Sequence, residues 1–128
     1  MKKMFLLFSH TLTATQKEDI SNNLKVKKTY TLPKNLQKLW SQVPVEKDLL
    51  FGDYLLDIEK CLLENLSSGD YVLIQGEFGA SYHMINFSKT HGFIPVYSVS
   101  KRIVRELTED GIVKKYSEFV HEFFREYT

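Results

Sequence analysis

The side chains best suited to chemistry in this chain follow three short apolar runs. They comprise hydroxyls, an amide, an imidazole and two cations, which suit the binding of a phosphate or another anion, together with one carboxylate. In chain order they are Ser9, His10, Gln75, Glu77, Ser98, Ser100, Lys101 and Arg102. Residues that follow parallel strands meet at one edge of a sheet, so this pattern predicts one polar site built from distant segments.

The stretch from Asp70 to Ile85 is the centre of this predicted site. Its first part, Tyr71–Ile74, is typical of a strand buried on both faces, and helical spacing begins directly after Gly76 and Gly79. We expect bare backbone N–H groups at the start of that helix, where they can hold an anion. The ligand-binding residues predicted in this turn are Gln75, Gly76, Glu77, Phe78, Gly79 and Ala80.

Several well-known sites are excluded by the same residues. No Lys-Ser/Thr pair follows the two glycines and no glycine lies in the first strand–helix turn, which excludes a P-loop and the dinucleotide fingerprint. His83, His91 and His121 have no metal-ligand spacing with Cys61, so we expect structural histidines and no metal or other cofactor. A Gly-x-x-Gly turn that only connects a strand to a helix remains the alternative to a binding turn.

Length and composition indicate one globular domain. The chain has 128 residues, of which 43% are hydrophobic, and a net charge of +1. Such a neutral chain lacks the broad basic field that binds duplex nucleic acid. With a single cysteine and no apolar run of transmembrane length, we expect a cytoplasmic protein without a membrane partner.

The predicted strands and helices alternate along the chain, which favours an α/β fold with parallel pairing of the strands. We expect a single Rossmann-like, doubly wound domain over residues 1–128, with a mostly parallel central sheet in the order 2-1-3-4. Residues 1–100 form its α/β core, and residues 101–128 form a C-terminal β-hairpin and tail. Strands are expected at about 4–8, 26–31, 71–75 and 93–99, helices at about 14–23, 33–43, 47–66 and up to 89, and a hairpin at 102–107 and 112–116.

Two local patterns support these elements. Thr13 and Gln16 have the spacing of a capping box, and Asp110-Gly111 between two β-like runs predicts a tight hairpin turn. The helix after Gly79 carries apolar residues on two faces, one of them marked by Tyr82 and Ile85, and is therefore expected to be largely covered.

Several segments together resemble a family of small CRISPR-associated proteins of type III systems, related to the CARF domains that sense cyclic oligoadenylates. The resemblance extends over nearly the whole chain. It rests on Phe5-Leu6-Leu7-Phe8-Ser9-His10, Leu32-Pro33, Trp40-Ser41-x-Val43-Pro44, Gln75-Gly76-Glu77-Phe78-Gly79-Ala80, Pro95-Val96-Tyr97-Ser98, Lys101-Arg102 and Phe119-x-His121-x-x-Phe124-Arg125. It implies a metal-independent ring nuclease, which cuts cyclic tetra-adenylate, with Ser9 and Lys101 at the positions of the family's functional serine and lysine.

The expected chemistry is attack by a ribose 2′-hydroxyl on its own 3′-phosphodiester, giving linear di-adenylates with a 2′,3′-cyclic phosphate. The protein then supplies mainly geometry and charge stabilisation. Lys101 and Arg102 would neutralise the phosphate, and backbone N–H groups of residues 76–80 would bind it. Ser9, Gln75, Ser98 and Ser100 would position the ligand, and His10 would shuttle the proton.

Two other interpretations use the same residues. A protein that binds the cyclic ligand without cutting it needs almost the same site. A protein-interaction adaptor would instead use the aromatic tail Phe119–Tyr127, although packing of a terminal strand also accounts for that tail. Because cyclic tetra-adenylate is a ring of near two-fold symmetry, we expect a C2 homodimer with the ligand across its axis.

Overall fold

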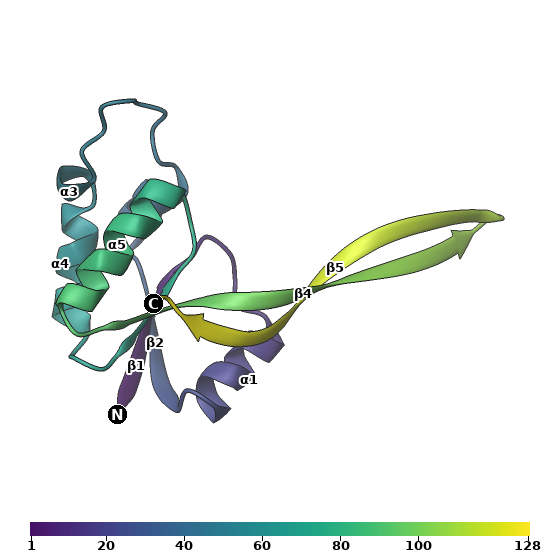
Figure 1. Cartoon of the computed structure of the whole chain (residues 1–128), viewed down its shortest axis with the longest axis horizontal. Coiled ribbons are helices and arrows are strands. Elements are labelled where there is room, and N and C mark those ends of the chain that lie inside the picture. The colour runs from purple at the N-terminus through teal and green to yellow at the C-terminus, as the bar shows by residue number, and fades with distance from the viewer.

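The computed structural model describes all 128 residues and has a mixed α/β fold around one five-stranded sheet (Figure 1). The strands are β1 (Lys2–Leu7), β2 (Val26–Thr31), β3 (Tyr71–Ile74), β4 (Ile94–Glu109) and β5 (Ile112–Glu126). The helices are α1 (Ala14–Asn22), α2 (Lys34–Ser41), α3 (Phe51–Tyr54), α4 (Leu56–Asn65) and α5 (Phe78–Thr90). No helix has both the length and the apolar character needed to cross a membrane.

The strand order is β2-β1-β3-β4-β5, which confirms the predicted order of the first four strands. β1 pairs in parallel with β2 and β3, and β3 pairs in parallel with β4. β5 runs antiparallel to β4, so the sheet is mixed. β2 lies at an edge of the sheet, and its Lys27 and Lys28 side chains are both exposed.

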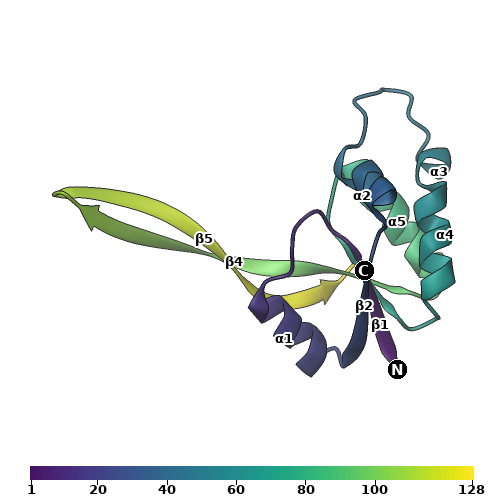
Figure 2. The ribbon, with the colours of Figure 1, turned by 180° about the vertical axis from the view of Figure 1, so that it is seen from behind.

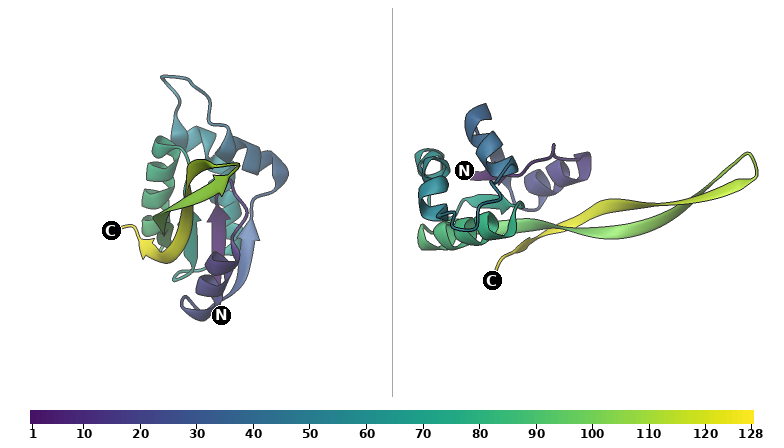
Figure 3. Two further views of the ribbon diagram at one scale, coloured as in Figure 1. Left: turned by 90° about the vertical axis from the view of Figure 1, so that its right-hand side faces the viewer. Right: turned by 90° about the horizontal axis from the view of Figure 1, so that it is seen from above.

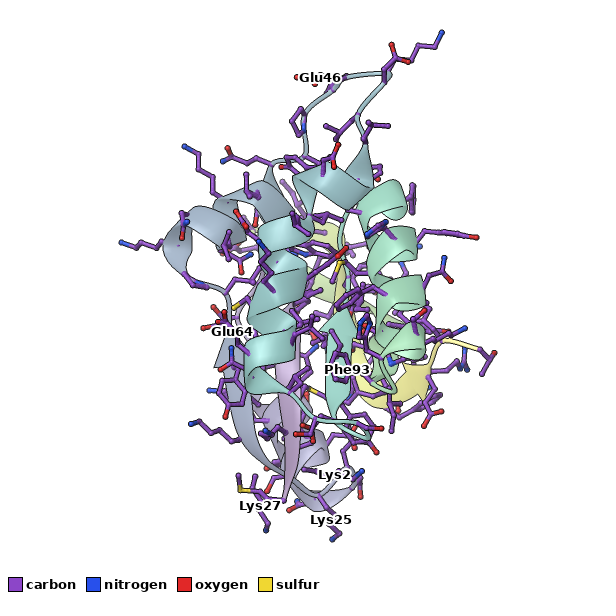
Figure 4. All side chains as sticks on the ribbon, turned by 90° about the vertical axis from the view of Figure 1, so that its left-hand side faces the viewer. Lys2, Lys25, Lys27, Glu46, Glu64 and Phe93 are labelled. Carbon is purple, nitrogen blue, oxygen red and sulfur yellow. The ribbon has the colours of Figure 1, made fainter.

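Helices cover both faces of the sheet because the central strands are apolar on both sides. Phe5 and Leu7 of β1 belong to the larger core, which includes residues of α2, α4 and α5. Met4 and Leu6 point to the opposite face and pack in a second core with Ile20 of α1. Figures 2 and 3 show α1 on one side of the sheet and α2 with the α3–α5 group on the other. In Figure 4, α4 and α5 run side by side across that second face.

Two helical predictions have different outcomes. The capping box is confirmed, since the Thr13 side chain accepts from the Gln16 backbone and the Gln16 side chain accepts from the Thr13 backbone. The single helix expected over residues 47–66 is wrong, because α3 and α4 are separate helices that meet at Leu55. Leu55 lies outside the helical conformation, with φ −97° and ψ 5°, and its side chain is fully buried. The break between α3 and α4 thus places this leucine in the larger core.

The C-terminal hairpin is much longer than predicted. The expected break between a strand at 93–99 and a hairpin strand at 102 is absent, and β4 is continuous from Ile94 to Glu109. The expected tail is part of β5, which pairs with β4 as far as Glu126. Asp110 and Gly111 form the tight turn with φ 52° and 77°, as the Asp-Gly pair predicted.

Figures 1 and 3 show that the outer part of this hairpin projects well away from the body of the protein. We call residues 101–120 the arm. The large apolar side chains that its two strands leave exposed are Val104, Leu107, Ile112, Val113, Tyr116 and Phe119. A two-stranded ribbon with no further packing is only marginally stable in water, so the arm has a surface suited to another packing partner.

Candidate functional site

A cavity of about 820 Å³ lies where the chain leaves β1 and β3 at their carboxyl ends. Its volume falls within the range of roughly 300–1,000 Å³ that is typical of small-molecule sites. It is lined by Phe8, Ser9, His10, Gln75, Gly76, Phe78, Ser81, Tyr82, Ile85, Asn86, Lys89, Tyr127 and Thr128. The pairing of Leu7 with Ile74 ends the two strands at the same level, so the residues that follow them share this cavity.

The predicted meeting of Ser9, His10, Gln75 and Gly76 is therefore observed. The Ser9 hydroxyl lies 2.9 Å from that of Ser41 in α2, which fixes one side of the serine. The His10 side chain is exposed and packs edge-on against Phe8, with a centroid distance of 5.4 Å. These contacts place a hydroxyl and an imidazole on the β1 side of the cavity.

Gln75 is held by three hydrogen bonds that leave only its amide nitrogen available. Its backbone N–H donates to Leu7 at 3.0 Å, its carbonyl accepts from the Trp40 indole at 3.3 Å, and its side-chain Oε1 accepts from the Ser98 backbone at 2.9 Å. The Nε2 group makes no hydrogen bond to protein, and Gln75 lines the cavity. A residue that lines the cavity therefore has two side-chain N–H donors without a protein partner.

Gly76 is needed because the Trp40 ring lies directly beneath the turn. A Cβ atom at position 76 would approach three atoms of the indole to 2.8–2.9 Å. Trp40 itself is only 1% exposed and belongs to the larger core. The turn that lines the cavity at Gly76 is thus packed directly on the indole of helix α2.

The expectation of bare N–H groups at the start of α5 is wrong. The Glu77 carboxylate accepts hydrogen bonds from the backbone N–H groups of Gly79 and Ala80 and caps the helix. Ala80 is fully buried, and a Cβ at Gly79 would approach the Phe51 ring to 2.7 Å. A second anion would meet the Glu77 charge, so Gly79 and Ala80 serve capping and packing in this structure.

Ser98 lies on the α1 face of the sheet, outside the cavity. Its hydroxyl is 2.5 Å from His121 Nδ1, and His121 Nε2 is 2.7 Å from Asp19 Oδ2. Gln16 also donates to the Ser98 hydroxyl, at 3.3 Å. The His121 side chain is only 3% exposed, so a substrate cannot reach this serine–histidine–aspartate chain, which ties α1 to β4 and β5. The Ser98 backbone N–H nevertheless acts on the cavity indirectly, because it donates to the Gln75 side chain, and Gln75 lines the cavity.

Ser100, Lys101 and Arg102 do not join the cavity of their own chain. All three side chains are exposed where β4 leaves the body, and Arg102 donates to Ser117 across the hairpin at 3.0 Å. The sequence placed them at a strand end, but β4 continues through them and carries them away from the ends of β1 and β3.

The sequence predicted Phe78 as a residue of the site, but the rest of the α5 side of the cavity was missed. Its lining residues on α5 are Phe78, Ser81, Tyr82, Ile85, Asn86 and Lys89, at the spacing of one helix face. The expectation that this face is covered is wrong, because Phe78 is 94% exposed and Tyr82 is 61% exposed. The signal in the sequence was the polar Asn86 and Lys89 on the same face as these rings.

The C-terminus forms the remaining wall. The Tyr127 hydroxyl donates to the Ile74 carbonyl at 2.7 Å, and its ring lies 4.7 Å from that of Tyr97. Burial, and then the proximity of Tyr97, raises the pKa of Tyr127 above its usual 10.0. The phenol therefore stays protonated and keeps the chain end attached to β3.

The other histidines and the cysteine have structural surroundings. His83 Nε2 lies 2.8 Å from Glu59 Oε1, and His91 Nδ1 lies 2.9 Å from the Phe87 carbonyl. Cys61 packs against the larger core, and burial raises the pKa of its thiol. No three His, Cys, Asp or Glu side chains are grouped so that they could hold a metal ion.

The fold and the cavity together define a mixed α/β domain with a ligand-sized site at the ends of two neighbouring parallel strands. The chain belongs to the family described as "Uncharacterized protein MJ1673 family", whose model matches residues 2–125. It is similar to uncharacterized protein MJ1673 of Methanocaldococcus jannaschii, with 46% identity over 127 residues, covering 99% of this chain and 98% of that protein. No solved structure matches the chain.

Proposed function

We propose that this protein is a metal-independent ring nuclease that binds cyclic tetra-adenylate and cleaves it into linear di-adenylates with 2′,3′-cyclic phosphates. The resemblance of its sequence motifs to CRISPR-associated proteins of type III systems motivates the substrate, and the domain would be a doubly wound, Rossmann-like sensor domain. The observation that carries the proposal is the cavity in which Ser9, His10 and the free amide of Gln75 meet.

The proposed reaction needs little from the protein beyond alignment. The ribose 2′-oxygen forms a bond to phosphorus and loses its proton, while the bond from phosphorus to the 5′-oxygen breaks and that oxygen gains a proton. Ser9 and the Gln75 amide would hold the ribose and phosphate in line. His10 is the proton carrier at this end of the cavity, and Lys89 is the lysine that lines it.

A second copy of the chain would supply the missing cations. Lys101 and Arg102 lie off the cavity of their own chain, at the base of an arm whose apolar side chains are exposed. In a C2 homodimer, each arm would pack on the partner and bring these cations toward a ring shared across the axis.

The test of this assembly is sedimentation equilibrium with and without cyclic tetra-adenylate. Phe119→Asp should weaken the dimer, while Leu63→Asp, at an exposed position on α4, should not. A monomer that binds one intact ring would refute this assembly.

Cleavage is tested with labelled cyclic tetra-adenylate and excess protein in EDTA. Wild type should convert the ring to di-adenylate, and Gln75→Ala should lower the single-turnover rate about 100-fold, since it removes a preorganised donor. Ser9→Ala should also be slow, whereas Ser21→Ala, which removes an exposed hydroxyl on α1, should cleave at the wild-type rate. Intact ligand after hours with saturating wild-type protein would refute the nuclease.

The alternative is a protein that binds the same ring without cutting it. It is favoured by one observation: His10 is exposed, and no hydrogen bond to another residue orients its ring. A ligand-induced rise in melting temperature without product would establish this binder. If the ligand does not raise the melting temperature at all, the protein is better explained as a protein-interaction adaptor that uses the exposed apolar surface of the arm.

A further inference from the structure

The cavity-facing side of α5 carries two large aromatic rings in water. Phe78 is 94% exposed and Tyr82 is 61% exposed, on successive turns of the helix, and both line the cavity. Phenylalanine is among the residues most often buried, so a nearly free ring at the rim of a cavity requires a reason. Rings in this position are suited to stacking on a flat ligand.

Polar groups without partners follow these rings along the same face. The Asn86 side chain makes no hydrogen bond to protein, although it lines the cavity. The Ser81 hydroxyl is buried and has no hydrogen-bond partner, which is costly unless a bound molecule supplies one. Lys89 lies one turn beyond Asn86 and places an ammonium group at the far end of the face.

The order of these groups corresponds to the order of groups in a nucleotide. An aromatic surface suits the face of a base, a carboxamide suits its edge, and an ammonium suits the phosphate. A carboxamide can accept from the adenine N6 amino group and donate to N7 at the same time. Guanine presents two acceptors at the corresponding positions, so Asn86 matches adenine better.

We propose that this face of α5 is an adenine-binding subsite, which we call the α5 platform. In it the base stacks on Phe78 and Tyr82, Asn86 binds the base edge, and Lys89 binds the neighbouring phosphate. The inference rests on the proposed function, since it specifies how the cyclic ligand is recognised. It assigns recognition to α5 and leaves the cleavage chemistry to Ser9 and its neighbours.

Stacking is tested by calorimetry with the 2′-deoxy form of cyclic tetra-adenylate, which lacks the attacking hydroxyl. The double variant Phe78→Ala/Tyr82→Ala should bind about 5- to 150-fold more weakly, as expected for the loss of base stacking. The control is Leu56→Ala/Leu63→Ala, which removes two half-exposed apolar side chains from α4 and should bind like wild type. Circular dichroism checks that both proteins are folded.

Base selectivity is tested with the corresponding cyclic tetra-guanylate. Asn86→Leu should lower the preference for the adenylate ring about 5- to 150-fold, while Asn35→Leu, on the exposed side of α2, should keep it. Wild-type affinity in the stacking variant, or unchanged selectivity in Asn86→Leu, would overturn the α5 platform while the nuclease stands if wild type still cleaves. Failure of wild type to bind or cleave any ring would overturn both.

Discussion

Replacing Gly76 by alanine should destabilise the whole domain although it adds only one methyl group. The new Cβ would lie 2.8–2.9 Å from the Trp40 ring, and ordinary contacts of this kind are 3.4–4 Å. The indole cannot easily move away, because it is 1% exposed and donates to the Gln75 carbonyl at 3.3 Å. Either the ring or the turn between β3 and α5 must shift by about half an ångström.

The cost should be about 1–3 kcal/mol, which is usual for an extra methyl group in a packed interior. In a domain of this length, that corresponds to a fall of roughly 4–12 °C in melting temperature. Gly52→Ala is the matched control, since no atom lies within 4 Å of the Cβ it would add. Because alanine is the better helix former, the control should keep its stability or gain up to about 1 kcal/mol.

The assay is urea and thermal unfolding followed by circular dichroism, for Gly76→Ala, Gly52→Ala and wild type. Trp40→Phe extends it to a double-mutant cycle, because a smaller ring should remove much of the cost of the added methyl group. A Gly76→Ala protein as stable as wild type, or additive effects in the cycle, would refute the argument that the indole fixes this turn.

Three further predictions test other parts of the structure. Lys101→Ala should leave thermal unfolding unchanged but weaken ring binding or cleavage about 10-fold relative to the arm control Lys114→Ala, and equal activities would refute the assignment of this lysine. Burial raises the pKa of Tyr127, so its contribution to the stability of the folded state is present below about pH 10 and is lost as the pH rises through the folded-state pKa. In urea unfolding, Tyr127→Phe should be about 1 kcal/mol less stable than wild type at pH 7 but should lose less stability than wild type above pH 10. His121→Ala should lower the free energy of unfolding by about 1–3 kcal/mol, since it removes the buried imidazole that joins Ser98 of β4 to Asp19 of α1 and leaves each of them with one hydrogen bond fewer, and an unchanged value would show that this link is dispensable.

The sequence was sufficient to predict the order of the parallel strands and the meeting of their ends. Runs that are apolar at every position, such as Met4–Phe8 and Tyr71–Ile74, predict strands covered on both faces, and the alternation with helices predicts parallel neighbours. From that topology, Ser9, His10, Gln75 and Gly76 had to lie together. The structure confirms their juxtaposition, and their roles remain predictions.

Local hydrogen bonding was not predictable in the same way. Glu77 was expected beside bare N–H groups, but its own carboxylate caps them. Whether a short acidic side chain turns back to its helix or toward a ligand depends on rotamers and neighbours that the residue pattern does not specify. The continuity of β4 through Lys101 has a similar cause, because β5 supplies hydrogen-bond partners far beyond the body of the sheet.

The sequence alone determined the order of the first four strands, since that order depends on the period of apolar residues and on the handedness of strand–helix–strand connections. Only the tertiary structure decided which apolar faces are covered. Met84 and Tyr82 lie on the same helix, yet Met84 is buried against the sheet while Tyr82 faces the cavity. Periodicity gives the direction of a side chain, whereas burial requires a partner, and distant elements such as β5 and the C-terminus supply or withhold that partner.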